Sequence, residues 1–235
     1  MIRWWFHFVF LWLAVLLPLL TWLRRKRFRR GASNLDTRRL YARVIVGQWT
    51  LALGVVFVFW KLGIPLKTLG LVAPDWLATA TLFAVVVVGA FLGARRLRAL
   101  QNDPAKLAKI RARAAGFSLL VPRTDEEERW WIVLSITAGV CEEILYRGYL
   151  GFYLGRSMPL PWVAVCASVF FGLAHLYQGS NAWRTLIAGA LLWATYLATG
   201  SILPGMVLHA LIDVQSGRAL RRAFTEPAPI AAPVP

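Results

Sequence analysis

The chain has 235 residues, of which 58% are hydrophobic and only 16% are charged, and it contains 12 Trp, 13 Phe and 6 Tyr. A typical soluble domain has about 45–50% apolar and about 25% charged residues, and a soluble chain of this size could not bury so much apolar surface. The composition therefore excludes a disordered chain, a disulfide-rich secreted domain and a typical cytosolic enzyme, and it predicts an integral membrane protein.

The formal net charge is +16, with 27 Lys and Arg against 11 Asp and Glu. A basic chain can bind nucleic acid, but its Lys and Arg should then line one folded face. Here the basic residues form short blocks between long apolar runs, which is typical of the loops that join membrane helices. We therefore expect the chain to sit in a lipid bilayer and to bind no nucleic acid.

Residues 1–100 are expected to form three transmembrane helices joined by basic loops. A membrane-spanning helix needs about 20 mostly apolar residues, and this region has apolar runs at about 4–23, 44–60 and 76–93. The first run is not typical of a signal peptide, because only Arg3 precedes it, no small-residue cleavage site ends it and a dense basic block follows. We therefore expect it to be retained as a helix.

Residues 101–129 are expected to form a basic, amphipathic cytoplasmic segment. Asp103 and Pro104 are typical of a helix start, and apolar residues then recur near helical spacing, with Lys and Arg between them: Leu107, Ile110, Ala114 and Phe117. Such a helix could lie on an anionic leaflet or could be solvated in the cytoplasm, and the pattern fits both. The capping-box sequence 124–127 predicts the start of the next helix.

Four further apolar runs follow, at about 130–150, 160–177, 183–199 and 202–214. Together with the first three they predict an all-α, polytopic membrane bundle of about seven transmembrane helices. We expect residues 130–216 to form one helical core. The Pro- and Ala-rich segment 217–235 is expected to be a disordered cytoplasmic tail.

The basic residues also predict an orientation in the membrane. Most of the 27 Lys and Arg lie between the first and second runs, between the third and fourth, or after the seventh. Because cytoplasmic loops carry the excess of Lys and Arg, the N-terminus is expected outside and the C-terminus in the cytoplasm. An odd number of crossings, such as seven, places the two termini on opposite sides of the membrane, in agreement with this orientation. We expect an integral protein of the plasma (inner) membrane.

Six ionisable residues interrupt the apolar runs of the C-terminal half. A charged side chain at the bilayer centre costs about 2.5–3.5 kcal/mol on insertion scales, so such residues are usually functional, although they can also form packing networks between helices. Their occurrence on three separate runs predicts one shared polar site. The six residues are Glu142, Glu143, Arg147, His175, His209 and Asp213.

Helical spacing predicts how the first three of these residues interact. Glu143 and Arg147 are four positions apart, so they share a face and are expected to form an ion pair. Glu142 is offset from Glu143 by about 100° and is expected to have no local partner. A desolvated glutamate without a partner can act as a general base.

The two histidine motifs also place pairs of residues on one helix face. Phe171 and His175 are four positions apart, and so are His209 and Asp213. A carboxylate beside an imidazole can fix its tautomer and orientation, in a catalytic or a metal site. Each pair alone could equally be a structural contact that shields polar groups from lipid.

In this order, Glu-Glu-x-x-x-Arg, Phe-x-x-x-His and His-x-x-x-Asp resemble the motifs of the CAAX-protease and bacteriocin-processing family, also called the abortive-infection family. The resemblance covers about residues 130–214. It implies an intramembrane endopeptidase that cuts a membrane-associated or C-terminal peptide, or a membrane protein. The alternatives are a membrane immunity or scaffold protein, and a small transporter that uses the polar residues as a proton relay.

The resemblance also implies a role for each residue. Glu142 and His175 would activate a water, His209 and Asp213 would line the pocket that stabilises the oxyanion, and three residues would support them: Glu143, Arg147 and Phe171. Prenyl-protease members carry Asn where this chain has Asp213. Because an ionised aspartate cannot donate a hydrogen bond, Asp213 is either protonated or orients His209.

A metal-independent glutamate mechanism is favoured over a metalloprotease. The chain has no His-Glu-x-x-His motif, and one glutamate is expected to be free to serve as the base. No cofactor is therefore expected. If zinc is present, it would be held by His175, His209 and Glu142.

Overall fold

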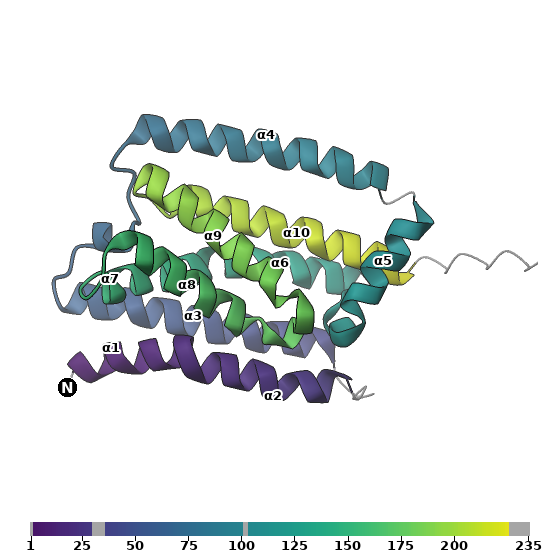
Figure 1. Ribbon diagram of the computed structural model, residues 1–235, viewed down its shortest axis with the longest axis horizontal. Coiled ribbons are helices and arrows are strands. Elements are labelled where there is room, and N and C mark those ends of the chain that lie inside the picture. The colour runs from purple at the N-terminus through teal and green to yellow at the C-terminus, as the bar shows by residue number, and fades with distance from the viewer. Residues whose placement is uncertain (1, 30–35, 101–102, 226–235) are drawn as a thin grey trace, which may run out of the picture.

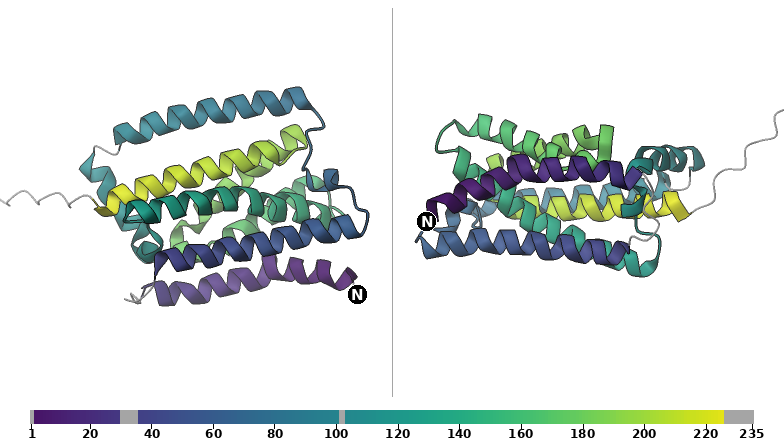
Figure 2. Two further views of the ribbon diagram at one scale, coloured as in Figure 1. Left: turned by 180° about the vertical axis from the view of Figure 1, so that it is seen from behind. Right: turned by 90° about the horizontal axis from the view of Figure 1, so that it is seen from below.

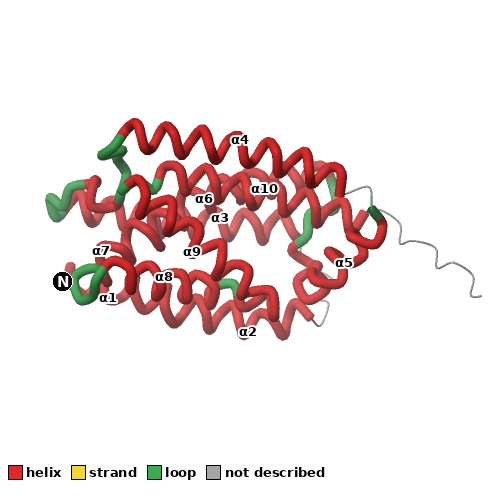
Figure 3. Tube along the Cα trace, turned by 45° about the horizontal axis from the view of Figure 1, so that its top comes forward, coloured by secondary structure: helices red, strands yellow, loops and turns green. Residues whose placement is uncertain are grey.

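The computed structural model describes residues 2–29, 36–100 and 103–225, and every regular element in these ranges is helical (Figure 1). The all-α prediction is therefore confirmed. The long helices lie side by side along one direction, and the connections between them lie mostly at the two ends (Figure 3). The N-terminus and the end of the last helix lie at opposite ends of the molecule (Figure 1).

The N-terminal half contains three long helical segments where the three apolar runs predict them. The first is built from α1 (Ile2–Leu11), a π-helical turn (Trp12–Leu16) and α2 (Leu17–Arg29), and the others are α3 (Thr37–Lys61) and α4 (Trp76–Leu100). All three are long and apolar enough to cross a membrane. All three extend beyond the predicted runs, and α3 begins earlier than predicted at a polar cap: the Asp36 side chain accepts hydrogen bonds from two backbone N–H groups of its first turn.

A basic helix follows where the amphipathic pattern predicts one. It is α5 (Pro104–Ala114), which continues into a 3-10 segment (Ala115–Leu120). The Asp103 side chain caps it by accepting hydrogen bonds from the N–H groups of Ala105 and Lys106. Leu107 and Ala114 are buried, and α5 packs against the last helix of the chain.

The C-terminal half contains five α-helices and two irregular helical segments. They are α6 (Asp125–Glu143), a π-helix (Ile144–Tyr149), α7 (Leu150–Leu154), α8 (Leu160–Ala174), a 3-10 segment (Leu176–Asn181), α9 (Ala182–Thr199) and α10 (Leu203–Thr225). The predicted capping box starts α6, with both reciprocal hydrogen bonds between Thr124 and Glu127 present. Helix α6 packs against α10 and α3.

The predicted count of seven spans is not confirmed. Among the described residues, three helices are long and apolar enough for a span, and α8 with α9 adds a fourth only if this pair, bent by 111°, counts as one broken span. Helix α8 has 15 residues, so it is about 22 Å long at 1.5 Å per residue, against a hydrocarbon core of about 30 Å. Apolar runs indicate the length of apolar segments, but they do not show that α8 and α9 are bent relative to each other.

The prediction of disorder from residue 217 onward is also wrong in part. Helix α10 continues to Thr225, and its last turns pack against α6, where Arg218 and Arg221 both pair with Glu128 and Arg221 also pairs with Asp125. These contacts order a segment that composition alone assigns to the tail. The remainder of the predicted tail, residues 226–235, lies outside the described residues.

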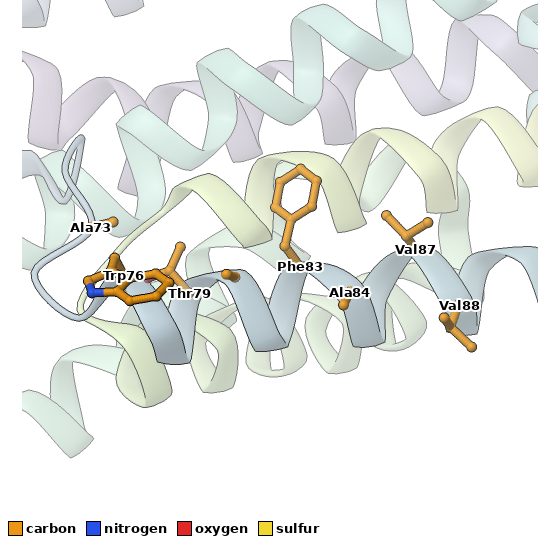
Figure 4. A pocket seen from close by; sticks show the side chains of 8 residues that line it. Ala73, Trp76, Thr79, Phe83, Ala84, Val87 and Val88 are labelled. Atoms are coloured by element: carbon orange, nitrogen blue, oxygen red, sulfur yellow. The ribbon is translucent and has the colours of Figure 1, made fainter.

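Helix α4 lies at one edge of the bundle and α1–α2 at the opposite edge, as two opposite views agree (Figures 1 and 2). Only 11% of the most apolar window of α4 is buried in the protein. A shallow apolar hollow on this helix contains no ionisable side chain (Figure 4), and its lining residues are Ala73, Trp76, Thr79, Ala80, Phe83, Ala84, Val87 and Val88. This face is suited to lipid chains and not to chemistry.

Candidate active site

The predicted ion pair between Glu143 and Arg147 is present and fully buried. Arg147 Nη1 donates to Glu143 Oε1 over 2.8 Å, and both residues are 0% exposed. Arg147 Nη2 donates to the carbonyl of Gly189 in α9 over 2.8 Å, and its guanidinium carbon lies 4.8 Å from the centre of the Phe171 ring. Arg147 thus ties the end of α6 to both α8 and α9.

Glu143 also holds His209, which α10 brings to the same place. The distance from His209 Nδ1 to Glu143 Oε1 is 3.0 Å, and because a carboxylate only accepts, the imidazole N–H is the donor. His209 Nε2 lies 3.7 Å from Asp213 Oδ2 and 3.8 Å from Glu142 Oε2, beyond hydrogen-bond distance. Glu143, from another helix, makes the hydrogen bond to Nδ1 of His209, and Asp213 lies near the other ring nitrogen.

Glu142 has a hydrogen-bond partner on another helix, which helical spacing does not address. Gln48 Nε2 on α3, 94 positions away in the chain, donates to Glu142 Oε1 over 2.6 Å. The other carboxylate oxygen, Oε2, is buried and has no hydrogen-bond partner among the described residues. One oxygen of Glu142 is thus fixed by an amide, while the other faces Nε2 of His209 at 3.8 Å.

His175 lies at the C-terminal end of α8, where its side chain bonds to its own helix. His175 Nδ1 lies 2.7 Å from the Phe171 carbonyl oxygen, so Nδ1–H donates and Nε2 of the neutral ring keeps a free lone pair. The Phe171 ring contacts both imidazoles, with ring centroids 4.8 Å from His175 and 5.6 Å from His209. Within the described residues, no hydrogen bond or ion pair joins His175 to Glu142.

The structure therefore brings sequence-predicted residues of three helices close together, with Glu143, Arg147 and His209 buried and the Asp213 side chain 36% exposed. In residues 2–29, 36–100 and 103–225, no three His, Cys, Asp or Glu side chains come together in a way that could hold a metal ion. The arrangement provides a carboxylate oxygen on Glu142 and an imidazole nitrogen on His175 with free lone pairs.

Sequence reasoning missed Gln48. Gln48 is uncharged, so it is not among the ionisable residues that interrupt the apolar runs. A signal was nevertheless present, because Gln48 is a polar side chain within the run 44–60, and an amide in a membrane helix normally needs a hydrogen-bond partner on another helix.

Comparison with known proteins places this site in a recognised domain. Residues 127–215 match the family model described as type II CAAX prenyl endopeptidase Rce1-like. The match confirms the predicted family resemblance for this part of the chain and supports a CAAX protease-like membrane enzyme. Every predicted site residue lies within the matched range, whereas Gln48 lies outside it.

A curated relative has a different description. It is an uncharacterized transporter, sll1319, from Synechocystis sp., which is 24% identical over 168 residues, corresponding to 66% of this chain and 49% of the relative. The chain therefore spans about half the length of the curated relative it matches. No solved structure matches the chain.

Proposed function

We propose that this protein is an intramembrane endopeptidase that hydrolyses a peptide bond of a membrane-associated or C-terminal peptide with a water activated by Glu142 and His175. The observation that carries this proposal is the state of the Glu142 carboxylate. Its Oε1 is fixed by Gln48, and its buried Oε2 has no hydrogen-bond partner among the described residues. A buried carboxylate oxygen with a free lone pair is suited to accept a proton from water.

In the proposed reaction, Glu142 Oε2 takes one proton from the water while His175 Nε2 accepts a hydrogen bond from the other. The water oxygen forms a bond to the carbonyl carbon of the peptide, and the carbonyl electron pair moves onto its oxygen. When the tetrahedral intermediate collapses, the C–N bond breaks and Glu142 returns its proton to the leaving nitrogen. No proton is gained or lost by the protein over the cycle.

His209 and Asp213 are proposed to stabilise the oxyanion. His209 Nδ1 is committed to Glu143, so Nε2 is the nitrogen that a proton would turn into a donor toward the substrate. Asp213 Oδ2 lies 3.7 Å from that nitrogen, close enough for a protonated Asp213 to donate to the same oxyanion. Glu143 and Arg147 act through His209 as its support.

The mechanism is proposed to be metal-independent, because it uses only the free lone pairs of Glu142 and His175. The substrate is proposed to approach from the bilayer, and the enzyme is proposed to lie in the plasma (inner) membrane with the N-terminus outside. Single cysteines at Arg38 and Lys67 test that orientation: we expect Arg38→Cys to be labelled from the cytoplasmic side and Lys67→Cys from outside. The reverse pattern would contradict it.

The second candidate function is transport, which the description of the Synechocystis relative as a transporter favours. Glu142, His209 and Asp213 would then pass protons between helices. Purified protein in liposomes distinguishes the two functions. An endopeptidase cleaves quenched-fluorescence peptides without a gradient, whereas a transporter moves protons or solute and leaves peptides intact.

The decisive variant is Glu142→Gln, which is nearly isosteric but cannot accept the proton. We expect the rate of peptide cleavage to fall by about 10²- to 10⁴-fold while the melting temperature in detergent is retained. Cleavage at the wild-type rate would refute the proposed function. Proteomic comparison of membranes containing the wild-type or the Glu142→Gln protein would then identify the peptides that are cut.

A further inference from the structure

Gln48 lies within α3, a helix outside the matched range 127–215. Helix α3 packs along α6, and two side-chain hydrogen bonds link neighbouring positions of α3 to α6. Gln48 Nε2 donates to Glu142 Oε1 over 2.6 Å, and Trp49 Nε1 donates to Thr137 Oγ1 over 3.3 Å. The first of these reaches the carboxylate of the proposed base.

Among the described residues, the amide of Gln48 makes one hydrogen bond, to Glu142. Its Oε1 atom is buried and has no hydrogen-bond partner among the described residues. An unpaired buried polar atom destabilises the folded protein, so this amide is not explained by helix packing alone. Its single hydrogen bond, to Glu142, is the interaction that distinguishes it from an apolar side chain at the same place.

We propose that Gln48 is a positioning residue, which holds Glu142 so that Oε2 is the oxygen presented to the water. This inference rests on the proposed function and deepens it, because it brings an N-terminal helix into the catalytic site. Hydrogen bonds to charged groups are shorter and stronger than neutral ones. The bond to Oε1 restricts rotation of the carboxylate and leaves the lone pairs of Oε2 to accept a proton.

The groups around Glu142 would otherwise give its carboxylate more than one orientation. His209 Nε2 is 3.8 Å from Oε2, and Asp213 Oδ2 lies 3.7 Å from the same nitrogen. Without the amide, Oε1 and Oε2 compete for the imidazole, and the base can turn away from the water. A reaction that depends on alignment to within an ångström is slowed by such freedom.

The test uses the full-length protein in liposomes with a cleavable peptide and compares Gln48→Met with Trp49→Phe. Methionine keeps the length of the side chain and removes the donor. Trp49→Phe removes the neighbouring α3–α6 hydrogen bond without touching Glu142, so it is a matched control. We expect Gln48→Met to lower kcat by about 10- to 100-fold and to leave KM unchanged, whereas Trp49→Phe keeps kcat near the wild-type value.

The same substitution in the Glu142→Gln background shows whether Gln48 acts through Glu142. We expect Gln48→Met to cause no further loss of the residual rate there. An undiminished kcat in Gln48→Met, an equal loss in Trp49→Phe, or a further loss of the same size in the Glu142→Gln background would each overturn the proposal. If Gln48→Met does not fold, Gln48→Asn replaces it, because its amide is one methylene too short for Glu142; wild-type kcat in that variant would also overturn the proposal.

These outcomes are distinct from failure of the proposed function. If Glu142→Gln cleaves peptide at the wild-type rate, the endopeptidase mechanism is wrong whatever Gln48 does. If Glu142→Gln is inactive and Gln48→Met is fully active, the mechanism stands and only the role of Gln48 is refuted.

Discussion

The N-terminal helices α1–α4 and the C-terminal helices α6–α10 use their apolar residues in different ways. The three N-terminal spans are long, and only 28%, 17% and 11% of their most apolar windows are buried in the protein. In the C-terminal half, Glu143, Arg147 and His209 are buried, and α8 and α9 are bent by 111°. The N-terminal spans thus bury little of their apolar surface in the protein, whereas the C-terminal helices enclose buried charged groups and include a sharply bent pair.

The largest effect on stability is expected from the buried ion pair of the C-terminal region. Glu143→Gln leaves the Arg147 guanidinium, which is 0% exposed, without its counter-charge. Breaking a buried pair by removing one partner costs about 3–5 kcal/mol. Unfolding in mixed detergent micelles, followed by loss of helicity, measures this difference.

The matched control is Glu126→Gln, which breaks the exposed pair between Glu126 and Arg38 that links α6 to the N-terminal region. Exposed ion pairs contribute little because water and salt screen them. We expect no measurable loss of stability. Equal losses of stability in Glu143→Gln and Glu126→Gln would show that the buried pair contributes no more than the exposed one.

The same substitution, glycine to alanine, is expected to have different effects in the N-terminal and the C-terminal region. A Cβ added at Gly47 on α3 meets no atom within 4 Å, whereas a Cβ at Gly217 on α10 would overlap the Trp131 indole of α6. We therefore expect Gly47→Ala to stabilise the protein by roughly 0.5–1 kcal/mol, because alanine is a better helix residue. Gly217→Ala is expected to destabilise it by about 1–3 kcal/mol through overpacking.

If the two substitutions change the free energy of unfolding in opposite directions, the result supports a difference in packing between the two regions. A stabilising effect at Gly217 would show that the end of α10 does not pack closely on Trp131. It would also remove one reason for the order of residues 217–225.

Local patterns predicted much of the fold. Helix starts at Asp103 and Thr124 follow from capping chemistry that involves only neighbouring residues. The Glu143–Arg147 pair follows from helical spacing. Apolar length located the three N-terminal helices, because in a helix surrounded mostly by lipid hydropathy is the main requirement.

What the sequence did not predict depends on contacts between distant segments. Gln48 reaches Glu142 from 94 positions away, and Glu143 takes the hydrogen bond of His209 that spacing within α10 had assigned to Asp213. The helical end of α10 is fixed by charges on α6. Helical periodicity predicts which residues share a face of one helix, but it does not predict which helices pack together.

A smaller effect is expected when the Asp213 carboxyl group is replaced by an amide that can also donate. Glu143, and not Asp213, holds Nδ1 of His209, so Asp213→Asn leaves the tautomer of His209 intact. The asparagine amide supplies an N–H donor in place of a protonated acid. We therefore expect Asp213→Asn to keep most of the peptide-cleavage activity, measured as kcat. A loss as large as that of Glu142→Gln would show that a carboxylate is required at this position.

The smallest effect is expected at the charged end where α6 meets α10. The side-chain hydrogen bond from Arg221 holds the pKa of Asp125 below its ordinary value of 3.8. Because folding lowers this pKa, the carboxylate stabilises the folded protein at pH values above the unfolded-state pKa, and that contribution is lost as the pH falls through the folded-state pKa. Asp125 is 85% exposed in its side chain, so the contribution is small.

Asp125→Asn should accordingly lower the melting temperature slightly at pH 7. The difference from wild type should vanish in acid, and also in about 1 M salt, where the screening length is about 3 Å. Glu143→Gln should keep its full effect in the same salt, because solvent ions do not reach a pair that is fully buried. If salt weakened both variants equally, the Glu143–Arg147 pair would have to be accessible to water, and the distinction between the enclosed polar cluster and the solvated end of the bundle would fail.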